Sequence, residues 1–352
     1  MKNFFTKYNI AHEIVAVAVS GGADSLALVL RLRDAGINVI ALTVDHGLRS
    51  ESRNEAIYVA DVMKKNGIEH HILTWEGEKP TVGIEELARQ ARYRLMFEFC
   101  KLRGVSVLAT GHHRRDQAET FLMRLQRGSG VYGLSGILPI SKRDGITVIR
   151  PQLEDDPENL KDYLRSKKIV WIDDPMNDSE DFLRVKIRKF LPELKKIGID
   201  EKRLADTASV ICKTRMFLQD TVDLFIKEHV RFWDGIVVAL SWKLLIEQPQ
   251  EIAMLILGQL VKKIGKTEYL PEAEELNRIL TYKDNFKGCT LGDCELLIAA
   301  KRLWIIPQDK ENTLMTKVEW ENFEEEYPNY RNSGFPYKVR RALRKYMKDN
   351  NG

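Results

Sequence analysis

The stretch Val15-Ala-Val-Ala-Val-Ser20-Gly21-Gly22-Ala23-Asp24-Ser25 predicts a buried strand that runs into a turn at the start of a helix. Its two adjacent glycines let the backbone turn tightly and present N–H groups to an anion, and the hydroxyls of Ser20 and Ser25 add two donors. The dipole of the following helix favours negative charge at the same place. The stretch therefore indicates a site for a phosphate or a pyrophosphate; the alternative is an ordinary turn between a strand and a helix.

This turn lacks the Gly-Lys-Ser/Thr ending of a Walker A loop, so it offers no lysine to β- and γ-phosphates. Asp24 would repel a bound phosphate unless a cation lay between them, which makes its carboxylate a candidate ligand for Mg²⁺. Two other glycine motifs are discounted as nucleotide sites. The GxGxxG match at 128–133 follows a helix instead of a strand, which favours a mobile, substrate-facing loop. Gly265-Lys-Thr has Leu260 where a Walker A loop has glycine, so this match arises by chance.

Strand and helix patterns alternate through the first half of the chain. Strict alternation predicts an α/β fold, a Rossmann-like parallel sheet with helices on both faces. Ligands of such sheets bind beyond the carboxyl ends of the strands, so we expect the loops at 20–25, 45–49 and 111–116 to converge on one crevice. The predicted strands are 14–19, 39–44, 70–73 and 105–110, and the predicted helices are 25–34, 51–66, 84–103 and 114–126.

The pattern changes after Pro151, where helical stretches predominate and strands become rare. The sequence predicts a smaller, mainly helical second domain with a short hairpin, and a boundary near residue 200 that gives domains 1–200 and 201–352. The long helix of this region has a discontinuous apolar face, formed by Leu204, Val210, Phe217, Val222 and Phe225. The predicted helices are 157–167, 182–194, 201–230, 242–263 and 272–280, and the hairpin involves 288–294, 296–299 and 303–306.

The composition is that of a globular protein, since 44% of the 352 residues are hydrophobic and 30% are charged. The net charge of +4 permits a polyanionic partner without requiring one. No apolar run approaches the roughly 20 residues of a membrane-spanning helix, so we expect a cytoplasmic protein with no membrane partner. The four scattered cysteines, Cys100, Cys212, Cys289 and Cys294, are typical of reduced thiols instead of a disulfide framework or a metal site.

A second polar group follows the predicted strand at 105–110. His112, Asp116 and Glu119 are spaced by four and three residues, which places them on one face of a helix. This arrangement indicates metal binding or proton transfer, and the alternative is a capped helix start with a solvated polar face. On the helix at 84–103, Glu85, Arg89 and Arg92 also share a face, for which ion pairing within the helix is the simplest interpretation.

The turn at Ser20–Ser25 resembles the pyrophosphate loop (PP-loop) of the N-type ATP pyrophosphatases, which cleave ATP between the α- and β-phosphates to adenylate a substrate. Further segments, in the same order, resemble the tRNA(Ile)-lysidine synthetase family. The likeness covers about residues 14–194, with a weaker echo at 290–294. The segments are 44–49, 86–93, 109–120, 124–136, 150–151, 174–177 and 184–194.

The resemblance implies a reaction in two steps on the wobble cytidine, position 34, of an isoleucine tRNA with a CAU anticodon. ATP activates C2 of the base as an adenylate and pyrophosphate leaves; the ε-amine of free L-lysine then attacks C2, AMP leaves and lysidine results. The implied cofactors are ATP and Mg²⁺, with the metal at Asp24. The implied ATP-binding residues are Ser20, Gly21, Gly22, Ala23, Asp24, Ser25, Val44, Asp45 and Gly111.

The resemblance also implies a lysine site. Asp116, together with Glu119, is assigned to the amine, and Arg89 or Arg184 to the carboxylate. His112 and His113 are alternative phosphate contacts, and Arg184 and Arg188 would close over ATP or tRNA. The family often has Asn after the first of these arginines, whereas this chain has Val185. The residues expected to act in catalysis are Asp24, Asp116 and Arg89.

Positive charge should guide the RNA to this crevice, and the candidates are Arg114, Arg115, Arg124, Arg127 and the tail at 338–345, which is equally typical of a solvated helix. The oligomeric state is left open, with a homodimer as one option. A tRNA thiolase is the closest alternative enzyme, but it needs a cysteine to carry sulfur, and Cys100 is expected in the core. A non-catalytic RNA-binding module would explain the arginines but not the Ser20 turn together with Asp116.

Overall fold

The computed structural model describes residues 1–11, 13–47, 52–77, 84–173, 183–267, 269–309, 314–330 and 334–350. The chain forms two compact units, Met1–Arg215 and Met216–Gly352, and each is described by itself. The division lies inside helix α9 (Glu201–His229), further along the chain than residue 200. Among the predicted features, 48–49, 174–177 and the side chain of Glu85 lie outside the described residues.

Unit 1 is built on a six-stranded sheet with the order β3-β2-β1-β4-β6-β5. The first five of these strands are mutually parallel, which confirms the predicted parallel sheet, and β5 pairs antiparallel with β6 at one edge. The strands are β1 (Val15–Ala18), β2 (Val39–Asp45), β3 (Glu69–Thr74), β4 (Val107–Ala109), β5 (Ile140–Arg143) and β6 (Ile146–Ile149).

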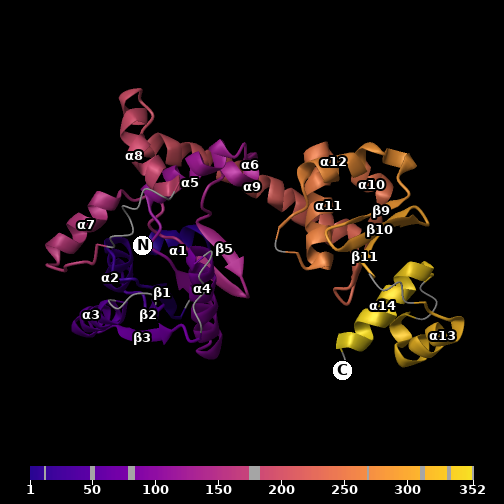
Figure 1. The fold of residues 1–352 in the computed structure, drawn as a ribbon, viewed down its shortest axis with the longest axis horizontal. Helices are drawn as coiled ribbons and strands as arrows, with labels where there is room; N and C mark the ends of the chain where they lie inside the picture. The colour runs from indigo at the N-terminus through magenta and orange to yellow at the C-terminus, as the bar shows by residue number, and fades with distance from the viewer. Residues whose placement is uncertain are drawn as a thin grey trace. The chain divides into compact units, whose positions relative to one another are not determined.

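Helices pack against both faces of this sheet (Figure 1), as predicted. Alternate residues of β1 show the two faces: Val15 and Val17 belong to one core with α2 and α3, whereas Ala16 belongs to a second core with α4. The helices are α1 (Lys2–Lys7), α2 (Ala23–Asp34), α3 (Ser52–Lys65), α4 (Ile84–Leu102), α5 (Arg114–Gln126), α6 (Val131–Leu134), α7 (Pro157–Ser166) and α8 (Leu183–Lys196).

Unit 2 contains a five-stranded antiparallel sheet with the order β7-β8-β11-β10-β9, which is larger than the predicted hairpin. Val238 of β8 faces a core with α11 and α12, and its neighbour Val237 faces a core with α13 and α14. The elements are β7 (Val230–Trp233), β8 (Val237–Ser241), α10 (Trp242–Ile246), α11 (Gln250–Gly265), α12 (Ala273–Thr281), β9 (Gly288–Leu291), β10 (Cys294–Ala299), β11 (Arg302–Pro307), α13 (Lys317–Glu326) and α14 (Tyr337–Asn350).

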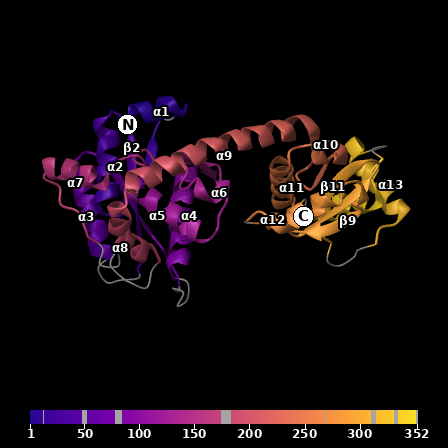
Figure 2. The same ribbon diagram turned by 90° about the horizontal axis from the view of Figure 1, so that it is seen from above.

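One prediction about α9 is wrong. Leu204, Val222 and Phe225 are buried as expected, but Val210 is 62% exposed and Phe217 is 70% exposed. Leu204 packs into a core of unit 1, and Val222 and Phe225 pack into a core of unit 2. Val210 and Phe217 lie on another side of the helix, which is why they stay exposed. Figure 2 shows α9 as one long, continuous helix.

All four cysteines are free thiols; Cys100, Cys212 and Cys294 are buried and Cys289 is half-buried. Within the described ranges, no helix is both long enough and apolar enough to cross a membrane.

Candidate active site

The turn between β1 and α2 has the shape that its glycines predict. Gly21 adopts a φ of +91°, and Gly22 is the extended residue that precedes the first turn of α2. The Ser25 hydroxyl accepts a hydrogen bond from the Ser20 N–H (3.1 Å) and donates one to the Gly22 carbonyl (3.0 Å). Ser25 therefore fixes the shape of the turn, and the amides at the start of α2 are left as candidate donors for an anion.

Gly21 has no room for a side chain. A Cβ atom there would lie 2.8 Å from Ile172 Cδ1 and 3.2 Å from Val59 Cγ2, while the Gly21 carbonyl accepts a hydrogen bond from the Ile172 N–H (3.0 Å). The segment at Ile172 thus supports the turn from outside, a contact that the sequence does not reveal.

We expect Gly21→Ala to lower the free energy of unfolding by about 2 kcal/mol, because alanine disfavours this φ and its methyl group would meet Ile172. This corresponds to a fall in Tm of about 4–8 °C, measured by thermal melting. Gly104→Ala is the matched control, since Gly104 also has a positive φ but no atom within 4 Å of the place where the methyl group would lie. Equal losses in the two variants would show that the contact with Ile172 has no effect.

Two segments distant in sequence close around the start of α2. A Cβ atom on Gly111 would lie 3.1 Å from the backbone of Asp24 and Ser25, so the loop after β4 touches the turn directly. The buried Gln152 amide donates to the Asp24 carbonyl (3.1 Å). The predicted convergence of the loops 20–25 and 111–116 is therefore confirmed.

His113 connects the two acidic residues that the sequence singled out. Its Nε2 lies 3.4 Å from Asp24 Oδ2, and its Nδ1 lies 3.5 Å from Asp116 Oδ2. His113 also caps α5: its N–H donates to Asp116 Oδ2 (3.0 Å), and its Nδ1 accepts from the Asp116 N–H (3.3 Å). Burial tends to lower the pKa of His113, but the adjacent carboxylates outweigh it and raise the pKa.

His112 lies in a different environment. Its Nδ1 is 2.9 Å from Thr110 Oγ1, and burial lowers its pKa to about 4 against the opposing effect of Asp116. The charges of Arg89 and Arg184 contribute to the lowering, so these predicted residues share one electrostatic neighbourhood. The pKa of Asp116 is lowered because His113, His112 and Arg184 outweigh its burial, and Asp116 is therefore ionised at neutral pH.

Glu119 is fully buried and holds two arginines of α8. Its Oε1 accepts from Arg188 Nε (2.9 Å), and its Oε2 lies 3.2 Å from Arg184 Nε. Burial raises the pKa of Glu119 although both arginines oppose this. The structure thus pairs Glu119 with Arg184 and Arg188. Val185, which follows Arg184 in the sequence, is buried.

On the β2 side, Val44 is half-buried and Asp45 is buried. Asp45 Oδ1 accepts from the Gly47 N–H (3.0 Å), and its Oδ2 lies 3.7 Å from Arg53. Asp45 therefore shapes the start of the loop after β2. Among the described contacts, none joins Val44 or Asp45 to the Ser20–Ser25 turn, so their roles at adenine stay predictions.

The GxGxxG segment at 128–133 is held by hydrogen bonds at Tyr132 and just after it, whereas its predicted mobility stays a prediction. Four residues beyond the segment, the Gln117 side chain makes two hydrogen bonds to the backbone of Ile137, at 2.9 and 2.6 Å. Arg215 donates to the Tyr132 carbonyl and to Ser135 Oγ, both at 2.9 Å. The segment follows α5 and forms the short helix α6, so it is not a dinucleotide-binding turn.

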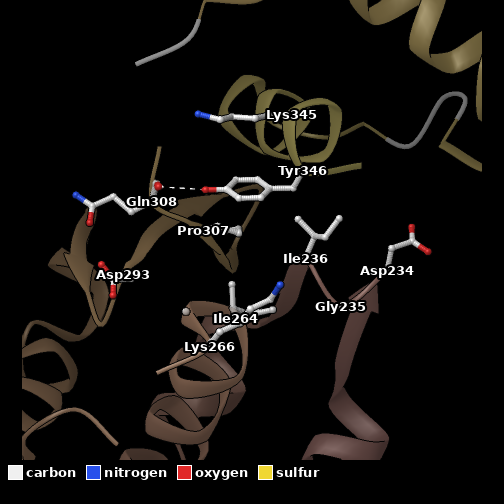
Figure 3. A pocket seen from close by; sticks show the side chains of 11 residues that line it. Asp234, Gly235, Ile236, Ile264, Lys266, Asp293, Pro307, Gln308, Lys345 and Tyr346 are labelled. Carbon is white, nitrogen blue, oxygen red and sulfur yellow. Dashed lines mark hydrogen bonds between the residues drawn. The ribbon is translucent and has the colours of Figure 1, made fainter. Parts of the chain in front are cut away.

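A pocket of about 620 Å³ lies in unit 2 (Figure 3). Tyr346 donates to the Gln308 carbonyl at its wall (3.3 Å), and the lining includes Gly265 and Lys266. These two residues end α11, with Lys266 in the left-handed conformation. A Walker A loop begins a helix, so the structure agrees with the view that this match is chance. None of the predicted site residues lines the pocket.

Comparisons with known proteins agree with this geometry. The model of the PP-loop domain matches residues 1–194. A tRNA(Ile)-lysidine synthase of Bradyrhizobium sp. (strain BTAi1) is 45% identical over 202 residues, which cover 56% of this chain and 56% of that protein. The tRNA(Ile)-lysidine synthase of Ruegeria pomeroyi is 36% identical over 293 residues, which cover 82% of this chain and 70% of that protein. This chain thus spans little more than half of the first relative and about two thirds of the second.

A solved structure of the U34-tRNA thiolase NcsA from Methanococcus maripaludis is 18% identical, with a TM-score of 0.48 over 59% of this chain and 72% of that chain; similarity this low carries no information about function. The PP-loop model, in contrast, matches more than half of this chain, and the Ruegeria relative is aligned over most of both proteins. These matches agree with the resemblance carried by the ordered motifs: the chain belongs to the tRNA(Ile)-lysidine synthase family.

Proposed function

We propose that this protein is a C–N bond-forming ligase that uses ATP to join free L-lysine to C2 of cytidine 34 in a CAU-anticodon tRNA(Ile). Family membership supports the overall reaction. The observation that carries the site is the bridge by His113 from Asp24, in the phosphate-binding turn, to Asp116 on α5. A site for ATP at Asp24 and a site for an amine at Asp116 would then lie beside the same imidazole ring.

In the first step, O2 of the cytidine attacks the α-phosphorus of ATP, the bond to the bridging oxygen of the β-phosphate breaks, and pyrophosphate leaves. The Ser20–Ser25 turn would hold the β- and γ-phosphates through its amides. The Asp24 carboxylate is 39% exposed, which leaves it accessible. Mg²⁺ in proteins is commonly held by one or two carboxylates with phosphates and water, so Asp24 fits such an ion, which would offset the phosphate charge.

In the second step, the lysine ε-amine attacks C2, a C–N bond forms, and the C2–O bond to AMP breaks. Asp116 is ionised and would hold the ε-ammonium group; its carboxylate would accept the proton that this group must lose before the nitrogen can attack. All the described contacts of this carboxylate use Oδ2, so Oδ1 is assigned to the amine.

The lysine carboxylate is assigned to Arg89 instead of Arg184. Glu119 lies 3.2 Å from Arg184 and offsets part of its positive charge, although the same carboxylate also pairs with Arg188. The Arg89 guanidinium lies over the Tyr93 ring at 5.4 Å, a contact that orients the arginine without neutralising its charge. Arg184 and Arg188, held by Glu119, would then serve ATP or the tRNA.

Binding of the tRNA backbone is assigned to arginines of unit 1 in preference to the basic tail at 338–345. In α14, Arg341 and Lys345 both pair with the buried Asp309, at 3.5 and 2.9 Å, so much of the tail charge is used inside unit 2. Arg114 and Arg115 are also paired, with Asp156 and Glu201. Arg124 and Arg127 are therefore the preferred contacts for the RNA backbone. A tRNA substrate also implies that the protein acts in the cytoplasm.

Thiolation is the less favoured reaction. Cys100 is fully buried, and burial raises the pKa of its thiol to about 11, so it would not form the thiolate that carries sulfur.

We expect radiolabelled lysine to become attached to a CAU-anticodon tRNA(Ile) transcript when the protein and ATP are both present. The control is the same transcript with uridine at position 34, which lacks the cytidine and should stay unlabelled. The label is measured on RNA separated by gel electrophoresis. Absence of an ATP-dependent label on the cytidine transcript would reject the proposed function.

A further inference from the structure

Gln152 is a fully buried polar side chain, which is unusual for a glutamine. Its amide makes two hydrogen bonds, and both of them reach α2. Nε2 donates to the Asp24 carbonyl (3.1 Å), and Oε1 accepts from Arg31 Nη1 (3.4 Å). Asp24 and Arg31 are seven residues apart, so they lie on one side of α2. One buried amide thus contacts the helix at two places, about 10 Å apart along its axis.

Gln152 begins a turn whose other end also holds α2. The Asp155 N–H donates to the Gln152 carbonyl (2.9 Å), which closes a turn at 152–155. The Asp155 carboxylate accepts from Arg31 Nη1 at 2.5 Å. Arg31 therefore binds both ends of the 152–155 turn and fixes this turn against α2.

The 152–155 turn also holds the start of α5. The Asp155 carbonyl accepts from the Arg114 N–H (3.0 Å), and the Glu154 carbonyl accepts from the Arg114 guanidinium (2.8 and 3.2 Å). Arg114 is the first residue of α5, so its N–H has no acceptor within the helix. The turn supplies that acceptor, and it thereby connects the first turns of two helices.

These two helix starts carry the acidic residues of the candidate site. Asp24 lies in the first turn of α2, and Asp116 lies in the first turn of α5. His113 lies between them, 3.4 Å from the first carboxylate and 3.5 Å from the second. Contacts at these distances depend on the separation of the two helix starts. In enzymes, a misplacement of about 1 Å can slow the reaction about 10²-fold.

We propose that Gln152 is a positioning residue for the ligase reaction, which holds the first turn of α2 in place relative to α5 so that Asp24 and Asp116 meet at His113. The inference rests on the proposed function, because Gln152 acts through the backbone of Asp24 and not on a substrate.

The fold itself does not require an amide at this position. An apolar side chain of the same size would avoid the cost of burying a polar group. Loss of the amide would also leave both of its partners with other contacts. Arg31 would keep Asp155, and the Asp24 carbonyl would keep the acceptor role that every carbonyl has inside an α-helix. We therefore expect the Gln152 amide to affect the geometry of the site more than the stability of the fold.

Gln152→Met tests the proposal, because methionine has a similar size and forms neither hydrogen bond. Asn66→Leu is the matched control. The Asn66 side chain donates to the Val62 carbonyl and accepts from Arg33, both at 2.8 Å, so it makes the same kinds of contact near the C-terminal end of α2. Thermal melting should show a fall in Tm of no more than about 4 °C in either variant.

Hydrogen exchange followed by mass spectrometry measures the local effect without reference to activity. In Gln152→Met, we expect amides at 23–28 to exchange about five- to tenfold faster and those at 114–119 about twofold faster, whereas Asn66→Leu should leave both unchanged. Unchanged exchange at 23–28 would show that Gln152 does not hold α2. Faster exchange there with no change at 114–119 would show that α5 is not coupled to it. If Gln152→Met fails to fold, Arg31→Met replaces it, with the same outcomes expected.

Kinetics of the full chain then test whether this geometry matters to the reaction. In Gln152→Met, kcat for lysine ligation should fall about tenfold or more, while KM for ATP changes less than about twofold because the backbone amides of the Ser20–Ser25 turn remain. Asn66→Leu should keep both constants. An unchanged kcat well below Tm, or a loss confined to KM, would overturn the positioning role. An inactive wild type would instead reject the proposed function, and the exchange rates would still decide whether Gln152 holds the two helices together.

Discussion

Asp24→Asn is expected to slow the release of pyrophosphate from ATP by about 10²–10³-fold, while tRNA binding stays nearly unchanged. The reason is the position of this carboxylate in the first turn of α2, next to the amides that would hold the β- and γ-phosphates. Without its charge, a bound cation is held less tightly and the leaving pyrophosphate is stabilised less. Asparagine preserves the size of the side chain and can still accept a hydrogen bond from His113, so the fold of the turn should persist.

Pyrophosphate release is measured with an enzyme-coupled assay, and tRNA binding by filter retention. Asp61→Asn is the matched control, because Asp61 is an exposed carboxylate on α3 of the same unit. A steeper dependence of the rate on Mg²⁺ concentration in Asp24→Asn would support the assigned metal contact. Release at the normal rate would mean that the metal role of Asp24 is wrong.

Asp116→Asn should separate the two half-reactions. Lysine transfer is expected to fall by about 10²–10³-fold, because a neutral amide neither attracts the ammonium group nor accepts its proton. Adenylation of the tRNA should fall by less than about tenfold, since asparagine can still accept the His113 N–H that caps α5. The variant should therefore accumulate adenylated tRNA.

The two half-reactions are followed with radiolabelled ATP and with radiolabelled lysine on the same tRNA. Thermal melting serves as the control for the helix cap, and Tm should change little. Equal losses in both half-reactions would place Asp116 in ATP or metal binding instead. Recovery of transfer at very high lysine concentration would show that its role is mainly to bind the ammonium group.

Much of the fold of unit 1 could be predicted from sequence, because parallel strands buried on both faces give apolar runs such as Val15–Val19 that alternate with amphipathic helices. The two antiparallel hairpins β5–β6 and β7–β8 were not predicted. Each is short, and each turns at an Asp-Gly pair, Asp144-Gly145 and Asp234-Gly235, with positive φ at both residues. This is the turn chemistry of tight hairpins, so the signal was present in the sequence.

Some contacts in the candidate site could not be predicted from the sequence. Spacing placed His112, Asp116 and Glu119 on one helix face, but it could not show that Arg184 and Arg188 reach Glu119 from another helix. Nor could it show that His113, adjacent to His112, is the ring that lies between two carboxylates. These pairings form between side chains that meet only after the chain has folded. The spacing of residues within one helix therefore cannot predict them.

The contact of Ile172 with the Ser20–Ser25 turn constrains which substitutions the chain can accept. Gly21, Val59 and Ile172 share one small volume, although they are far apart in sequence. A larger residue at any one of them is acceptable only if another becomes smaller, so the three positions are expected to drift together. Among related sequences, we then expect the size of residue 172, which lies outside every recognisable motif, to vary together with the size of residue 59.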